Sequence, residues 1–361
     1  MGPAELARAE TCPSRSRKMF EMPMLPRTFD AAYRDSHDKR PKVRAEAIFE
    51  LVRATREEQR EQTGARLVAA LADPIPAVVI AALLGLADLG WVQAQPQVER
   101  LLTHPDLNVR AYAVLSFGEL GQSDASATAE RLAPFLCARE PRIRYQALMA
   151  VGRLTPTVAL PTLLDSLCDE DDEVVDGALR LLEEGLVAGS YIQEPRVQEA
   201  LLRVARQGRA GRNHRVEALA QRIAIEQELD APQDALVRLI RGDFAPREAS
   251  DLLAALELIG RRRLPGFEAA LERRAFGWFG FSLDPCRYLA QAVLAALGQP
   301  RAAKLVRRHL THGNRVARVA TINAIGLFRV REFSELLRAA RKANPGLEGP
   351  IDEALGRLDE P

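Results

Sequence analysis

Apolar and polar residues along most of the chain follow the spacing of a helix. Apolar residues recur at positions i, i+3, i+4 and i+7, the pattern of a helix that buries one face. The clearest stretch is LNVRAYAVLSFGELG at residues 107–121, and similar stretches lie at residues 42–52, 141–152 and 284–298. Shorter amphipathic stretches alternate with them, at residues 65–73, 129–136, 160–167 and 197–204. The pattern predicts paired helices and not strands.

The longer stretches return at a nearly constant interval. An equivalent position near the start of each one recurs every 31 to 35 residues, with one interval of 42. These positions are Arg44, Val79, Arg110, Arg144, Val175, Glu217, Leu252, Arg287 and Arg318. Because a single helical pair cannot bury its own apolar face, this repeat is typical of hairpins stacked side by side. We expect an all-α fold, an α-solenoid of about nine to ten stacked helical hairpins.

The same pattern divides the chain into three parts. Residues 1–25 lack apolar periodicity and are predicted to be a disordered or extended N-terminal lead. Residues 26–345 form the predicted repeat array, and residues 346–361 a C-terminal capping helix and tail. Glycines follow several predicted helices, where a left-handed cap is expected. These are Gly90, Gly121 and Gly298.

Two stretches lengthen the repeat. Residues 186–196 contain Gly189, Ser190 and Tyr191 and predict an extended loop. Residues 276–281, FGWFGF, concentrate aromatic side chains around Trp278. Such a segment either anchors a partner, since exposed aromatics make binding hot spots, or folds back onto the array to fill a gap.

The recurring motif resembles the HEAT repeat, and most closely the bacterial type named after phycobilisome lyases. The resemblance covers roughly residues 40–340 and rests on D-x-x-V-R-A at residues 106–111 and R-I-R at residues 142–144. It implies that the arginine of the motif meets an acidic side chain of a neighbouring turn. Arg44, Arg110 and Arg144 fit this role, Arg287 and Arg318 fit it in part, and Val79 and Val175 depart from it. The motif indicates the fold and says almost nothing about function.

Charge is distributed unevenly along the chain. The formal net charge is +1, but residues 1–200 hold 23 Lys/Arg against 30 Asp/Glu, whereas residues 201–361 hold 27 against 19. Residues 301–342 alone contain 11 basic residues and only Glu332 and Glu335 as acids. Three interpretations stay open for this stretch: solvated helix faces, a surface for an acidic protein, or a surface for nucleic-acid phosphates.

A stacked array offers a long concave surface, and its exposed second-helix residues are the candidates for binding a partner. Tyr112, Tyr145 and Tyr288 follow the motif arginines and either line one strip on this surface or pack between repeats. The candidate partner-binding residues are Arg110, Tyr112, Arg144, Tyr145, Arg287, Tyr288, Arg318, Trp278, Arg307, Arg308 and Arg315.

Motifs for catalysis or metal binding do not stand out. The histidines are scattered, and no His-Glu pair occurs of the kind with which HEAT-like hydroxylases hold two irons. The cysteines form no CxxC pair and are expected to be small buried side chains. The acidic run at residues 169–173 lacks the glycine and ligand spacing of a calcium loop and suits a helix start. We expect no cofactor, no metal and no catalytic residue.

The sequence therefore favours a non-catalytic cytoplasmic scaffold or adaptor that binds a protein partner, possibly an acidic one, on the concave face. No apolar run approaches the roughly 20 residues of a membrane span, so no membrane association is expected. One alternative is a nucleic-acid-binding solenoid that uses the basic C-terminal repeats. A second, by family analogy, is a subunit of a lyase or modifying enzyme.

Overall fold

The computed structural model describes residues 27–192, 194–206, 214–246, 249–276, 286–344 and 346–359. Within these residues the regular structure is helical and there is no strand, which confirms the predicted all-α solenoid. The predicted lead at residues 1–25 and the aromatic residue Trp278 lie outside the described ranges. The chain forms two compact units, Met1–Ser116 and Phe117–Pro361.

The first unit contains two layers of short helices. In one layer α2 packs against α4, while α1 and α3 cover them from the other layer. The helices are α1 (Phe29–Asp35), α2 (Pro41–Ala54), α3 (Arg60–Ala70), α4 (Pro76–Leu89) and α5 (Gln95–Arg100), with 3₁₀ turns at Glu57–Gln59, Val92–Ala94 and Leu101–Thr103. Proline at the first helical position of α2 and α4 suits a helix start, because the N–H that it lacks has no partner there.

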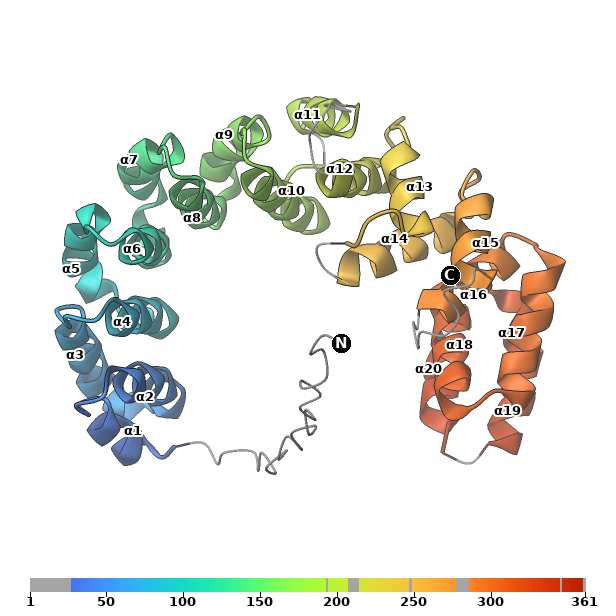
Figure 1. Cartoon of the computed structure of the whole chain (residues 1–361), viewed down its shortest axis with the longest axis horizontal. Helices are drawn as coiled ribbons and strands as arrows, with labels where there is room; N and C mark the ends of the chain where they lie inside the picture. Colours follow the sequence, from blue (N-terminus) through green and yellow to red (C-terminus); the bar gives the residue numbers. More distant parts are fainter. Residues whose placement is uncertain are drawn as a thin grey trace, which may run out of the picture. The chain divides into compact units, whose positions relative to one another are not determined.

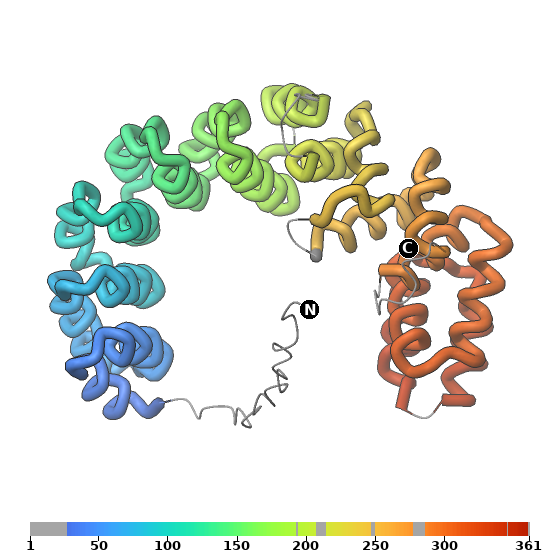
Figure 2. Tube along the Cα trace, viewed as in Figure 1, coloured from blue at the N-terminus to red at the C-terminus, as the bar shows by residue number. Residues whose placement is uncertain are grey.

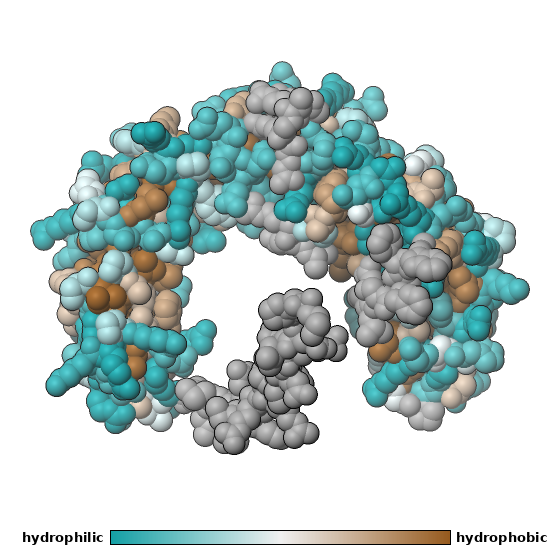
Figure 3. All heavy atoms as spheres, viewed as in Figure 1, coloured by the Kyte–Doolittle hydropathy of each residue, from teal (hydrophilic) through white to brown (hydrophobic). Residues whose placement is uncertain are grey.

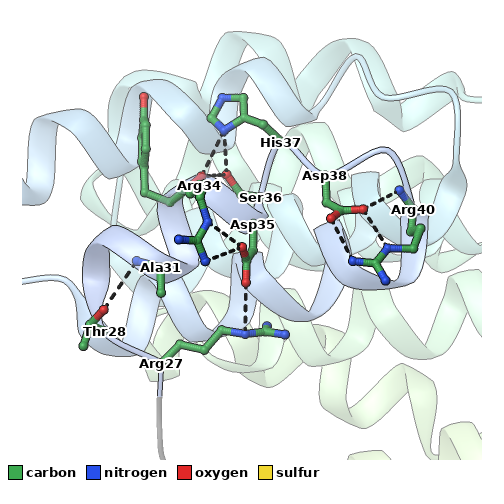
Figure 4. A network of polar contacts seen from close by, with 10 residues as sticks. Arg27, Thr28, Ala31, Arg34, Asp35, Ser36, His37, Asp38 and Arg40 are labelled. Carbon is green, nitrogen blue, oxygen red and sulfur yellow. Dashed lines mark hydrogen bonds and ion pairs between the residues drawn. The ribbon is translucent and has the colours of Figure 1, made fainter.

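A polar network closes the beginning of this unit (Figure 4). The Thr28 hydroxyl caps α1 by accepting from the Ala31 N–H at 3.4 Å. Beyond the helix, Asp38 accepts from the backbone N–H of Arg40 at 2.8 Å and from its guanidinium at 3.0 Å. These hydrogen bonds with Arg40 hold the pKa of Asp38 well below its usual range. The network sets the turn from which α2 begins.

The second unit stacks helical hairpins in two layers (Figure 1). The second helices of the hairpins pack in the series α8, α10, α12, α14, α16, α18 and α20, and the first helices form the other layer. The tube view follows the same path hairpin by hairpin (Figure 2). The helix α6 (Leu107–Leu120) crosses the boundary between the units.

Helix lengths in the second unit follow the predicted repeat. The first helices are α7 (Ala125–Leu136), α9 (Pro156–Ser166), α11 (Pro195–Arg206), α13 (Asp234–Arg241), α15 (Glu268–Phe276), α17 (Pro300–His312) and α19 (Ser334–Ala343). The second helices are α8 (Pro141–Gly152), α10 (Asp172–Val187), α12 (His214–Glu226), α14 (Ala249–Arg262), α16 (Cys286–Ala296), α18 (Arg315–Leu327) and α20 (Glu348–Asp359). Short 3₁₀ turns lie at Gln122–Asp124 and Arg331–Phe333.

Helix ends confirm several local predictions and correct one. Gly90 and Gly298 adopt φ values of 61° and 83°, the left-handed conformation expected of glycine caps. Gly121 has φ −93°, so the predicted left-handed cap is wrong there. The chain instead enters a 3₁₀ turn, and the Gly121 carbonyl accepts from the Thr128 hydroxyl at 2.7 Å. In the acidic run, Asp171 caps α10 by accepting from the N–H groups of its first turn.

The loop between α10 and α11 is shorter than predicted. Its residues are 188–194, because α10 continues to Val187 and α11 begins at Pro195. The loop is held by Tyr191, which is 6% exposed and whose hydroxyl donates to the Pro156 carbonyl at 3.4 Å. The aromatic ring packs against Gly185 of α10, where a Cβ atom would collide with it.

Two cysteines contradict the prediction of buried thiols. Cys137 and Cys168 are both free and exposed, and Cys286 is half-buried. Cys137 and Cys168 follow the last turns of α7 and α9, where the chain leaves the layer. The core positions of those helices are occupied instead by Leu132 and Leu163, which are fully buried.

Close packing of α6 on α8 predicts that Gly118→Ala is destabilising. A Cβ atom at Gly118 would lie 2.5 Å from the Ala150 Cβ and 3.1 Å from its Cα, so the helices must separate. We expect a loss of about 1–3 kcal/mol in the free energy of unfolding, measured by urea titration. The control is Gly356→Ala on α20, where a Cβ meets nothing within 4 Å. That change should be neutral or stabilise by up to about 1 kcal/mol. Equal losses in both variants would contradict the close contact.

Candidate partner-binding surfaces

The motif arginine of the first unit, Arg44, forms hydrogen bonds to the turn of the next hairpin, and we call this set of bonds the clasp. On α2, the Arg44 guanidinium donates to both carboxylate oxygens of Asp73, Nε to Oδ2 at 2.8 Å and Nη2 to Oδ1 at 2.9 Å. Its Nη1 donates to the carbonyls of Asp38 and Lys39 at 2.9 and 3.1 Å. Asp73 in turn accepts from the Ile75 N–H at the start of α4. One side chain therefore joins the turn before its own helix to the turn of the next hairpin.

Arg144 repeats this clasp in the second unit. Its Nε and Nη2 donate to the Asp169 carboxylate at 2.8 Å each, and its Nη1 donates to the carbonyls of Ala138 and Arg139 at 2.9 and 3.1 Å. The hydrogen bonds to Asp169 raise the pKa of Arg144. Arg144 is 7% exposed, so its observed role is structural, as the family resemblance implied. Its contact with a partner stays a prediction.

Among the remaining motif arginines, Arg318 departs from this geometry. Arg318 donates to the side-chain oxygen of Asn344 in place of a carboxylate, and to the Thr311 carbonyl at 3.3 Å. Arg110 donates to the His104 carbonyl at 3.1 Å and is half-buried. Arg287 is half-buried on α16. Their roles in binding a partner also stay predictions.

Two of the three candidate tyrosines pack between helices. A Cβ on Gly177 of α10 would lie 2.8 Å from Cε2 of Tyr145, so this ring fills the place that a larger residue would occupy. Tyr288 meets His309 of α17 edge to face, with ring centroids 5.2 Å apart. Burial lowers the pKa of His309, followed in effect by nearby basic residues. Tyr112 is half-buried on α6. A strip of tyrosines that meets a partner stays a prediction.

A charged network that the sequence interpretation missed joins α10, α12 and α14. Arg180 donates to Asp176 at 2.9 Å and to both oxygens of Asp251 at 3.2 and 3.1 Å. Arg222, which is 4% exposed, likewise pairs with Glu183 and Glu226 at 2.8 and 2.9 Å. The sequence did contain a signal for this network, because charged residues occur at interior positions of these otherwise apolar helices. Because each guanidinium meets two carboxylates, the network is suited to hold the three helices together.

The second helices near the C-terminus enclose an open apolar groove, which we call the α18 groove. Its volume is about 720 Å³. Its most exposed apolar residues are Leu253 of α14, at 40%, and Val316 of α18, at 56%. The lining is Leu253, Leu289, Arg315, Val316, Val319, Ala320, Asn323, Leu327, Glu353 and Arg357. Elsewhere hydrophilic residues cover most of the surface visible in Figure 3, with hydrophobic residues in scattered patches.

Of the groove residues, only Arg315 was a sequence-based candidate. The missed signal is a second apolar stripe on α18. Val316, Val319 and Leu327 follow helical spacing on one side, whereas fully or nearly fully buried Ile322 and Ile325 mark the core side. A helix that is apolar on two sides has more apolar surface than stacking covers. The second apolar stripe of α18 is therefore available to a ligand.

Two further candidates, Arg307 and Arg308, lie on the other layer. Both are exposed on α17, beside a hollow of about 640 Å³ whose lining is Arg301, Lys304, Leu305, Arg307, Arg308, Thr311 and His312. Within the basic stretch 301–342, Arg315 thus lines the α18 groove, whereas Arg307 and Arg308 lie on the first-helix layer. Trp278 lies outside the described residues, so its candidacy stays a prediction.

Metal-binding clusters and membrane-spanning helices are both absent from the described ranges. No three His, Cys, Asp or Glu side chains in those residues are placed to share a metal ion. None of the described helices combines the length and the apolar character that crossing a membrane requires.

Comparison with known proteins supports the repeat assignment for part of the chain. Residues 94–183 match the family HEAT repeats. No curated protein sequence matches the chain. Among solved structures, the chain is similar to a crystal structure of an engineered protein, with 13% sequence identity and a TM-score of 0.38. That similarity covers 92% of this chain and 99% of the other.

The clasp at Arg144 predicts that replacing this one buried arginine lowers the free energy of unfolding substantially. In Arg144→Met, Asp169 and two carbonyls lose a buried donor, so we expect a loss of about 3–5 kcal/mol in the free energy of unfolding. The control is Arg139→Met, since Arg139 is exposed and lies five residues away. It should change stability by less than about 0.5 kcal/mol. Chemical denaturation compares the two, and similar effects would contradict a structural clasp.

The clasp at Asp73 predicts an acid-sensitive contribution to stability. Burial opposes ionisation of Asp73, but its hydrogen bonds, above all with Arg44, lower its pKa below 3.8 in the folded chain. The contribution is therefore present above the unfolded pKa and is lost as pH falls through the folded one. We expect the stability difference between wild type and Asp73→Asn to shrink between about pH 5 and pH 2, measured by urea denaturation. A constant difference across this range would show that the pair does not titrate in this way.

Proposed function

We propose that this chain is a non-catalytic scaffold that binds a protein partner in the α18 groove. The observation that carries the proposal is a second-helix face with 720 Å³ of open groove and exposed apolar residues on two helices. HEAT repeats, which residues 94–183 match, typically serve as protein-interaction scaffolds. A cytoplasmic location and the bacterial phycobilisome-lyase type of repeat belong to the same proposal. Among the other candidates, Tyr288 and Arg318 would act mainly by holding this face in shape, through their contacts with His309 and Asn344.

The shape of the groove favours an amphipathic helix as the bound segment. Its apolar floor on α18 runs from Val316 to Leu327, which is about 16 Å or three helical turns. A partner helix could place apolar side chains there at positions i, i+3 or i+4, and i+7. This length and spacing match one face of a short helix better than an extended strand.

Charges at the rim favour an acidic residue on that helix. On one wall Glu353 and Arg357 pair with each other at 2.8 Å, which leaves little net charge there. Arg315 lies at the first turn of α18 and has no ion pair within the described part of the chain. A carboxylate near this end of the bound helix would therefore complement the groove. The lining is otherwise aliphatic, with one amide, which is a composition for binding apolar side chains.

The groove predicts that Val316→Asp strongly weakens binding of an amphipathic helix. The probe is a fluorescent helical peptide with leucines at i, i+3, i+4 and i+7 and glutamates beside them, titrated with the full chain. We expect saturable binding to wild type and at least about a tenfold loss in the variant, because a carboxylate in the apolar floor must be desolvated. Arg315→Glu should weaken binding less, since that charge lies at the rim.

The control is Val187→Asp, which makes the same change at an 85% exposed position outside the groove. It should bind the peptide as wild type does. Absence of saturable binding to wild type, or equal losses in Val316→Asp and Val187→Asp, would refute the proposal. Circular dichroism of each variant separates loss of the groove from loss of the fold.

A further inference from the structure

We propose that α17 carries a second binding surface, for an extended acidic segment of a protein. We call it the α17 basic face, and its residues are Arg301, Lys304, Arg307 and Arg308. The helix contains no acidic residue, and all four side chains are exposed. They surround a hollow of about 640 Å³ whose floor includes the half-buried Leu305.

The positive charge of this face is not neutralised by the fold. None of the four residues forms an ion pair with a carboxylate in the residues that the structure describes. The neighbouring basic helix α19 differs, because Arg338 pairs with Glu335 and Arg341 with Asp352. Charge of one sign therefore gathers on α17, where it can attract an anionic partner.

Two of the guanidinium groups are held in place before a ligand arrives. Arg301 lies over the Phe276 ring at 4.3 Å from its centroid, and Arg307 lies over the Phe333 ring at 5.7 Å. These cation–π contacts restrict the side chains of Arg301 and Arg307 in the free chain. Ordering in the free chain reduces the entropy that binding would otherwise cost.

The spacing of the cations suits an extended peptide. Lys304 and Arg308 are one helical turn apart, about 6 Å along the axis. Side chains at alternate positions of an extended chain repeat at about 6.6 Å on one side. A segment with acidic residues at alternate positions can therefore place successive carboxylates beside successive turns of α17.

The same residues favour a protein over a nucleic acid. Proteins that bind single strands usually combine basic side chains with exposed aromatic rings on which bases stack. Here Arg301 covers Phe276, and Phe333 is 1% exposed, so neither ring is open to a base. The cations from Arg301 to Arg308 span only about 10 Å of one helix, which reaches few phosphates.

The test is fluorescence anisotropy with a labelled peptide of alternating glutamate and alanine, titrated with the full chain at low salt. We expect saturable binding that weakens as salt is added. Lys304→Glu/Arg308→Glu should reduce the affinity at least about tenfold, since two attractions become repulsions. Arg301 and Arg307 are left unchanged because their guanidinium groups lie over aromatic rings.

The matched control is Arg196→Glu/Arg203→Glu on α11, which makes the same charge change at two exposed arginines. It should retain most of the affinity, as should Val316→Asp in the α18 groove, which separates this proposal from the preceding one. Absence of saturable binding, or equal losses in both double variants, would overturn the α17 basic face. Tighter binding of a single-stranded oligonucleotide of equal charge, lost in Lys304→Glu/Arg308→Glu, would overturn it in favour of nucleic acid.

Discussion

The apolar face that each helical hairpin presents to the next is the constraint on which this structure depends. A hairpin of two short helices cannot bury that face alone, so it must be stacked. In the second unit this produces continuous cores, one of which runs from Ala218 on α12 to Leu358 on α20. Small residues such as Gly118 allow neighbouring helices to approach closely. Burial between hairpins, and not helix propensity, then supplies most of the stability.

Polar contacts set the orientation of the hairpins, which burial of apolar side chains holds together. The clasps of Arg44 with Asp73 and of Arg144 with Asp169 join the turns of successive hairpins by the same set of bonds. At Val79 and Val175 the repeat lacks the arginine, and both residues are buried instead. Stacking therefore tolerates loss of the clasp at individual positions. The Arg180 and Arg222 networks add charged links across α10, α12 and α14, where the repeat is least regular.

Function in such an array is left to the surface that stacking does not cover. The α18 groove and the α17 basic face lie on different layers of the same unit, one apolar and one cationic. Two chemically different surfaces on one unit would allow a scaffold to hold an amphipathic helix and an acidic segment together.

The sequence by itself determined the helical repeat and the stacking of hairpins, because these depend on spacing that recurs along the chain. The roles of Arg44 and Arg144 followed from the resemblance to HEAT repeats. It also located the basic stretch that contains Arg307, Arg308 and Arg315. Only the tertiary structure decided which side chains remain exposed to solvent. Cys137 and Cys168 are exposed, although buried thiols were predicted. Arg144 is buried, whereas Val316 is exposed. The physical reason is that periodicity assigns a residue to a helix face. Whether another helix covers that face depends on residues tens of positions away, as the contact between Arg180 and Asp251 shows.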